Sequence, residues 1–162
     1  MPIIRSLANE DEIAEFSEGS CHVFALAVHR MTGWPMHVVL DHGEPYWVDP
    51  EDCDNWIPSV IHVFCVDESD RFWDIRGCRP RDEVYREMTD WMNIIEYDSD
   101  LIHDEAALSI YVGCWGEDEL IDRPLMDYTE AEVTEAASAA RRVLGGLPDN
   151  PASRAVGQPS MA

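Results

Sequence analysis

An almost unbroken apolar segment, CHVFALAVHRM at residues 21–31, constrains the fold more than any other part of the chain. A helix that is hydrophobic on nearly every side is stable only when other elements cover it all round. Gly33 follows as a natural C-cap, and the Trp34-Pro35 pair does not continue the helix. The sequence therefore predicts a buried helix over residues 21–31 at the centre of the fold.

Two hairpins are predicted to follow this helix, because apolar runs alternate with turn residues. The predicted strands are MHVVLD (36–41), YWVD (46–49), VIHVFCVD (60–67) and RFWDIRG (71–77). The Gly- and Pro-containing residues 41–45 supply the first turn, and Glu68-Ser69 the second. The third run is apolar on both faces, which places it in the interior of the sheet.

Further elements surround this core. Residues 82–97 carry one apolar stripe at helical spacing, and Thr129 and Glu132 have the spacing of a capping box. We expect a short acidic helix at 8–16, helices at 82–97 and 129–144, a strand at 107–115 and a disordered tail at 147–162. The expected architecture is α+β: one domain over residues 1–146, in which the central helix packs on a small antiparallel sheet and additional C-terminal helices follow.

The composition limits the partners. The 162 residues include 33 acidic residues against 11 basic ones, a net charge of −22, and every basic residue is Arg. Such a surface repels phosphates and anionic lipids, so direct binding to nucleic acid or a membrane is not expected. The charge serves solubility or, alternatively, mimics a nucleic acid duplex to occupy a DNA-binding protein. The chain has no Lys, and Gln158 is its only Gln. This composition reflects a GC-rich genome or, alternatively, an enzyme that acts on Gln or Lys side chains and so avoids modifying itself.

The five cysteines indicate a reduced chain. Their number is odd and their spacing shows no pairs, so at least one free thiol is expected. The first residues show no secretory signal pattern, and no apolar stretch reaches the length of a membrane span. These features together predict a cytoplasmic protein.

Cys21 stands at the predicted start of the central helix, where unpaired N–H groups and the helix dipole stabilise an anion. Gly19-Ser20 precedes it and offers a flexible approach and a capping hydroxyl. A thiol in such a position has a lowered pKa and is a better nucleophile at neutral pH. Cys65, inside a predicted strand, is most simply a small core residue.

His62 and Asp74 lie on the two strands of the second predicted hairpin. With a turn of about two or three residues they become direct or diagonal neighbours across the antiparallel pair, close enough for a carboxylate–imidazole hydrogen bond. A buried His and a buried Asp are costly unless each satisfies the other. The alternatives are a core histidine at position 62 and a carboxylate at position 74 that pairs with Arg76.

The run Gly-Ser-Cys-His-Val-Phe-Ala at residues 19–25 resembles the nucleophile motif of papain-like cysteine proteases and, equally, that of transglutaminases. Both groups order their catalytic residues as Cys, His, then Asn or Asp. The resemblance implies that Cys21 is the nucleophile, His62 the general base and acid, and Asp74 the orienting residue. It also implies a protein or peptide substrate, a thioester intermediate, and no cofactor or metal.

The sequence departs from the two motifs around the nucleophile. His22 replaces the usual aromatic, and Glu15 occupies the position of the oxyanion-stabilising Gln of papain-like proteases. The Trp that transglutaminases place upstream is missing, since Trp34 is the first Trp. The backbone N–H of Cys21 remains one oxyanion donor. Candidates for a second donor or for groove residues are Ser20, His22, Trp34 and Trp73.

Two other interpretations stay open. A metal site would combine His22, His29, His37 and His42 with Cys53 or Asp41, although no spacing among them fits a familiar zinc pattern. An acidic binding or inhibitor protein on the same fold, without catalysis, is the alternative to the cysteine enzyme. The substitutions at positions 15 and 22 favour that alternative.

Overall fold

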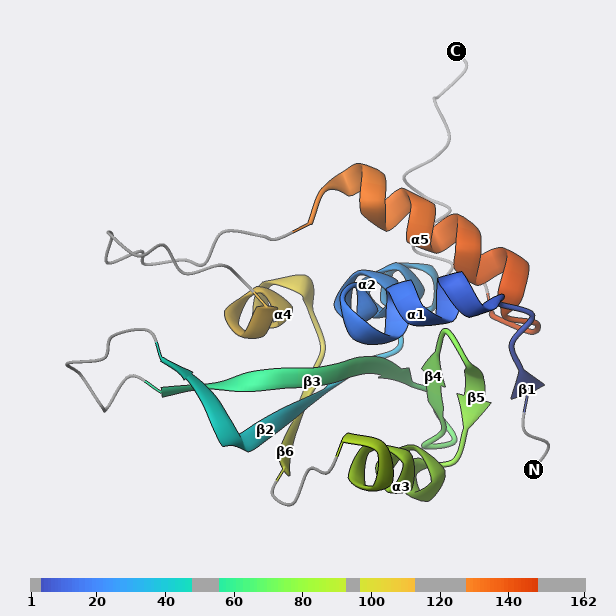
Figure 1. Ribbon diagram of the computed structural model, residues 1–162. Helices are drawn as coiled ribbons and strands as arrows, with labels where there is room; N and C mark the ends of the chain where they lie inside the picture. Colours follow the sequence, from blue (N-terminus) through green and yellow to red (C-terminus); the bar gives the residue numbers. More distant parts are fainter. Residues whose placement is uncertain (1–3, 48–55, 93–96, 113–127, 149–162) are drawn as a thin grey trace, which may run out of the picture.

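The computed structural model describes residues 4–47, 56–92, 97–112 and 128–148 (Figure 1). Within these ranges the chain forms five helices and one six-stranded antiparallel sheet with the strand order β1-β5-β4-β3-β2-β6, which confirms the α+β class. The strands are β1 Ile4–Arg5, β2 Met36–Trp47, β3 Trp56–Val66, β4 Phe72–Asp74, β5 Gly77–Arg79 and β6 Tyr97–Ile102. The helices are α1 Glu10–Glu18, α2 Cys21–Thr32, α3 Arg81–Met92, α4 Glu105–Val112 and α5 Glu130–Val143.

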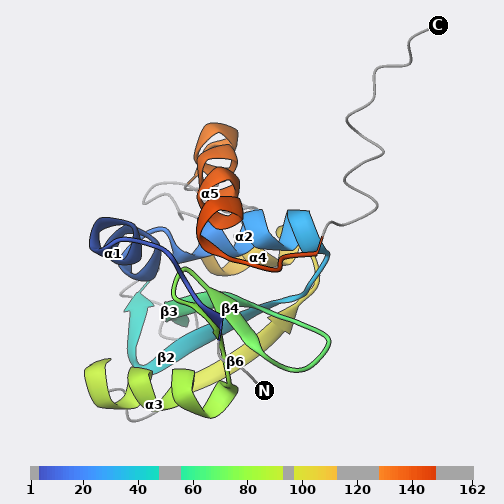
Figure 2. The same ribbon diagram turned by 90° about the vertical axis from the view of Figure 1, so that its right-hand side faces the viewer.

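The helices form layers on both sides of the sheet (Figures 1 and 2). Helix α2 packs on one face and is itself covered by α1, α4 and α5, so its first eight residues are all buried. Helix α3 lies on the opposite face, where a smaller core cluster joins it to the sheet. The buried helix predicted at residues 21–31 is confirmed for residues 21–28, and residues 29–31 are half-buried.

The helix ends agree with the capping signals in the sequence. The predicted helices at 8–16, 21–31 and 129–144 correspond to α1, α2 and α5. Asn9 and Thr129 both close capping boxes, and Gly33 ends α2 in the left-handed conformation with φ 76°. The predicted helix at 82–97 is confirmed over α3 as far as Met92, but Tyr97 already belongs to a strand.

The first predicted hairpin is wrong. Residues 41–45 do not turn the chain back, because β2 runs without interruption from Met36 to Trp47 and pairs with β3 on both sides of them, up to Asp41 and again from Tyr46. The Gly- and Pro-containing stretch falls where the register between the two strands shifts, between Asp41 and Tyr46. Glycine and proline inside a strand are tolerated at such irregularities, so the same residues that suggested a turn mark a break in pairing.

The predicted strand at 107–115 is also wrong, since residues 105–112 form α4. The Asp104 carboxylate accepts the Ala107 N–H at 2.8 Å, which favours the start of a helix. Only Leu108 of this helix is buried, so its apolar residues do not follow the alternation of a strand. Residues 113–115 of the prediction, and the predicted tail from residue 149 onward, lie outside the described residues.

The strand β6 was not predicted. It pairs with β2 at one edge of the sheet, and of its six residues only Ile102 is buried. An exposed edge strand lacks the apolar alternation by which a strand is recognised in a sequence. Its place in the sequence falls at the end of the helix that was predicted to reach residue 97.

The second predicted hairpin is present, but its second strand is divided. Strand β3 lies between β2 and β4, and β4 ends at Asp74 before a turn leads to β5. Gly77, at φ 110°, starts β5 next to β1, and a Cβ atom there would lie 2.0 Å from the Ile4 carbonyl oxygen. Only glycine permits this close approach of the two strands. In the described part of the chain, no helix has the length and apolarity needed to cross a membrane.

Candidate active site

The nucleophile candidate, Cys21, is the first residue of α2 and is 8% exposed. The first hydrogen bond of the helix joins the Phe24 N–H to the Ser20 carbonyl oxygen. The N–H groups of the first three residues therefore have no acceptor inside the helix, and they concentrate positive potential at its N-terminus. Ser20 occupies the N-cap position, but its side chain makes no capping hydrogen bond, contrary to the expected capping hydroxyl.

The histidine candidate, His62, lies on β3 beside the end of β4. In these two strands Cys65 pairs with Trp73 and Val66 with Phe72, so β3 extends past β4 at His62. The same register places Asp74 and His62 diagonally across the pair. The His62 Nε2 atom lies 3.0 Å from Asp74 Oδ2, and both residues are at least nine-tenths buried.

The carboxylate of Asp74 is held by two further donors. Its Oδ1 atom accepts the backbone N–H of Arg76 at 2.8 Å, and its Oδ2 atom accepts Arg79 Nη2 at 2.9 Å. Arg79 also pairs with Glu87 on α3. Burial opposes ionisation of Asp74, but the bonds and charges of His62 and Arg79 outweigh it and lower its pKa to about 2. The carboxylate is therefore ionised at neutral pH.

The thiol and the imidazole shift each other in opposite directions. Burial disfavours the Cys21 thiolate, yet hydrogen bonds from His22, His62 and the Val63 N–H lower the pKa of Cys21 to about 6. Burial also disfavours the charged imidazole, yet the bonds to Asp74 and Cys21 raise the pKa of His62 to about 9. These directions favour a thiolate–imidazolium pair at neutral pH.

Each group of this pair is aligned by the fold. Because His62 Nε2 is bonded to Asp74, the other ring nitrogen, Nδ1, is the one available to the sulfur. The Val63 N–H and the His62 ring both act on the sulfur, since both lower the pKa of Cys21. His62 is in turn hydrogen-bonded to Asp74, so a thiol, an imidazole and a carboxylate from three separate elements influence one another.

The other described cysteines differ from Cys21. Cys65 is fully buried in the sheet, where its thiol donates to the Ala25 carbonyl oxygen at 3.1 Å. Burial raises the pKa of both Cys65 and Cys78. Cys21, Cys65 and Cys78 are all free thiols, but only Cys21 has its pKa lowered among them.

Of the remaining site candidates, one lies beside Cys21 and two belong to the hydrophobic core. His22 is buried beside Cys21, and its ring lies 5.9 Å from the ring of Tyr128. Trp34 and Trp73 are buried in the main core with their ring centroids 5.3 Å apart, and we assign them to packing. Glu15 is exposed on α1. Of these four side chains, only His22 lowers the pKa of Cys21.

Sequence reasoning missed Arg79, the Val63 N–H and Tyr128. The sequence offered Arg76 as the partner of Asp74. In the structure only the backbone N–H of Arg76 bonds to Asp74, and its side chain pairs with Glu87. The signal for Arg79 is weak: an Arg five residues after a buried Asp. No local pattern marks Tyr128, because more than 100 residues separate it from His22.

The metal interpretation gains no support. Among the residues that the structure describes, no three or more His, Cys, Asp and Glu side chains are grouped to hold a metal ion. His29 instead bonds to the Trp34 carbonyl oxygen through Nδ1 at 2.7 Å, and His37 Nε2 bonds to the Tyr85 hydroxyl at 2.9 Å. Cys53 and the side chain of His42 lie outside the described residues.

Comparison with known proteins leaves the site to be judged by its geometry alone. The chain matches no protein-family model, no curated protein and no solved structure.

Proposed function

We propose that this protein is a cysteine-dependent acyl-transfer enzyme of the papain-like or transglutaminase-like type. The observation that carries the proposal is the buried hydrogen bond between His62 and Asp74, together with the lowered pKa that His62 gives to the Cys21 thiol at the start of α2. A thiol at a helix N-terminus, an imidazole and an ionised carboxylate supply the nucleophile, the proton carrier and the orienting group that thiol acyl transfer needs. The motif at residues 19–25 and the packing of its helix on an antiparallel sheet support the same family.

In the first step, the Cys21 thiolate attacks an amide carbonyl carbon, and the electron pair of the C=O bond moves to oxygen. The Cys21 N–H at the start of α2 stabilises this oxyanion. The charged His62 imidazole then donates its proton to the leaving nitrogen, the C–N bond breaks, and a thioester forms. Asp74 keeps the imidazole oriented throughout.

In the second step, neutral His62 removes a proton from the acceptor, which attacks the thioester carbon. The C–S bond breaks, the sulfur leaves as thiolate, and His62 is again protonated. Water as acceptor gives a peptidase or deamidase, whereas an amine gives a transglutaminase. The chemistry requires no cofactor or metal at either step.

The charge of the chain favours a protein or peptide substrate that is neutral or basic. A net charge of −22 attracts cationic groups to the surface and repels nucleic acids and anionic membranes. Free thiols at Cys21, Cys65 and Cys78 fit a reducing compartment, and we place the protein in the cytoplasm.

Acylation of the enzyme by an activated phenyl ester tests the proposal. We expect a stoichiometric burst of phenolate and an acyl group on Cys21 by mass spectrometry, with both lost in Cys21→Ala and strongly slowed in His62→Ala. The matched control is Cys78→Ala, which removes a free thiol that has a raised pKa. Acylation that is slow and indifferent to His62 would contradict the enzyme and favour the second candidate, an acidic binding protein, which the charge and the exposed Glu15 support.

A further inference from the structure

His22 is buried next to the nucleophile and is held from a distant part of the chain. It is 8% exposed, and its ring packs against Tyr128 with the two planes inclined by 53°. Tyr128 lies just before the N-cap of α5 and is itself buried. The imidazole that follows the nucleophile is therefore fixed by the segment that enters the last helix.

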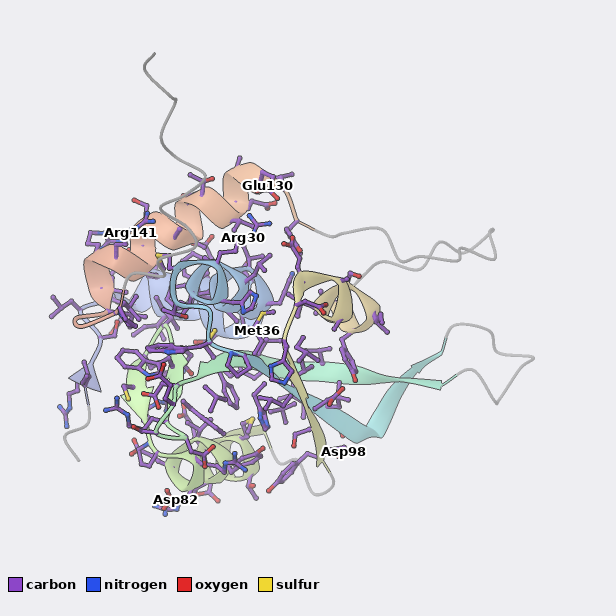
Figure 3. The ribbon with its side chains drawn as sticks, turned by 180° about the vertical axis from the view of Figure 1, so that it is seen from behind. Arg30, Met36, Asp82, Asp98, Glu130 and Arg141 are labelled. Atoms are coloured by element: carbon purple, nitrogen blue, oxygen red, sulfur yellow. The ribbon has the colours of Figure 1, made fainter. Side chains whose placement is uncertain are left out.

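Tyr128 is in turn held by a polar network separate from the proposed catalytic triad of Cys21, His62 and Asp74. Its hydroxyl donates to Glu105 of α4 at 2.9 Å, and Arg30 of α2 pairs with the same carboxylate at 2.8 Å. Arg30 also pairs with Glu130 at the start of α5 at 2.7 Å. Figure 3 shows Arg30 and Glu130 on the side of the molecule where α2 and α5 lie next to each other. Three helices thus fix the position of one tyrosine.

We propose that His22 is a positioning residue for the Cys21 sulfur, held there by Tyr128, so that the thiolate lies between two imidazoles. Its importance for catalysis rests on the proposed function, but its effect on the thiol can be measured separately. A ring N–H of His22 stabilises the thiolate by donating to it, and this bond is lost when the side chain is apolar. Among the groups that lower the pKa of Cys21, His22 stands beside His62.

Charged groups from several elements face this imidazole. Cys21 adjoins it on α2, and His62 of β3 shares the same sulfur. Glu132 of α5 interacts with it electrostatically. Glu105 of α4 accepts the hydroxyl hydrogen bond of Tyr128, whose ring packs on His22. An imidazole in this acidic surrounding can donate an N–H to the sulfur.

The test is the pH dependence of Cys21 alkylation by iodoacetamide, followed by peptide mass spectrometry alongside thermal melting. We expect His22→Phe to move the midpoint upward by about one pH unit, which means about fivefold less thiolate at a pH of about 6, the wild-type midpoint, and about tenfold less well below it. Tyr128→Ala moves it in the same direction, and Tyr128→Phe less, because the ring is retained. His29→Phe, on the same helix but bonded to the Trp34 carbonyl oxygen, leaves the midpoint unchanged. A structural role alone would lower the melting temperature without moving the midpoint.

Equal midpoints in wild type and His22→Phe, or equal shifts in His22→Phe and His29→Phe, would overturn the proposal. A second measurement covers the case in which His22→Phe does not fold. In the wild-type protein, blocking Cys21 with a methylthio group should shift the NMR signals of the His22 ring and leave those of His29 in place. Unmoved His22 signals would refute the contact. If Cys21 is never acylated but its alkylation midpoint depends on His22, only the proposed enzyme activity is refuted. If Cys21 is acylated but its midpoint does not depend on His22, only the positioning role of His22 is refuted.

Discussion

Replacing Asp74 by Asn removes the charge at the end of the proposed catalytic chain while keeping the shape of the side chain. The rise of the His62 pKa from 6.5 to about 9 corresponds to about 3 kcal/mol in favour of the charged imidazole. Asp74 and Cys21 share this stabilisation, so the substitution should remove about half of it. A loss of between about 1 and 2 kcal/mol lowers the equilibrium constant for forming the thiolate–imidazolium pair about tenfold.

The assay is again the pH dependence of Cys21 alkylation, combined with denaturant unfolding. Asp74→Asn should react about fivefold more slowly at a pH of about 6, where the wild-type thiol is half ionised, and about tenfold more slowly well below it. It should also lower the free energy of unfolding by about 3 kcal/mol, at the lower end for a broken buried ion pair, because Arg79 keeps Glu87 as a partner.

Asp67→Asn is the matched control. Asp67 is a second buried carboxylate on the same sheet, and it accepts the Trp73 indole N–H at 2.8 Å and an ion pair from Arg71. Its replacement should reduce stability without changing the reactivity of Cys21. If Asp74→Asn also leaves that reactivity unchanged, the chain of charges from Asp74 to the sulfur does not exist, and the triad is refuted.

Three further predictions concern stability and the other thiols. Gly77→Ala should cost about 1–3 kcal/mol in chemical denaturation, because of its φ of 110° and the backbone in contact with it, whereas Gly145→Ala, with open space around it, should be close to neutral. Burial lowers the pKa of His37 to about 4, so as the pH falls the unfolded chain binds a proton at this residue before the folded protein does. Wild type should therefore lose up to about 3 kcal/mol more stability than His37→Phe between pH 6.5 and about 4. An equal loss in both proteins would contradict the assignment. Cys65→Ala should leave the alkylation of Cys21 unchanged but lower the melting temperature, and a labelled Cys65 in the native wild type would show that its burial has been misjudged.

Local signals predicted the helices other than α4, and the strands less well. The capping boxes at Asn9 and Thr129 and the glycine at position 33 fix helix ends through contacts within a few residues. Strand identity depends on partners far away in the sequence. The stretch at 41–45 has turn composition yet continues β2, because the pairing with β3 before and after it outweighs its local preference. The exposed strand β6 left no pattern at all.

The candidate site shows the same division. Its order of thiol, imidazole and carboxylate could be predicted because each residue stood in a recognisable local context: a helix start for Cys21 and neighbouring strands for His62 and Asp74. The supporting groups could not. Arg79 joins Asp74 to α3, and Tyr128 reaches His22 across more than 100 residues, contacts that exist only after the helices have packed.

The sequence by itself determined that a buried apolar helix begins with a cysteine and that a histidine and an aspartate follow on adjacent strands. Hydrophobic periodicity and capping are local properties, and local properties can be read along a chain. Only the tertiary structure decided that β4 stops at Asp74 and that the imidazole and a backbone N–H then meet the sulfur. Those contacts depend on strand register and on the burial of charges, which arise from the packing of segments that are distant in sequence.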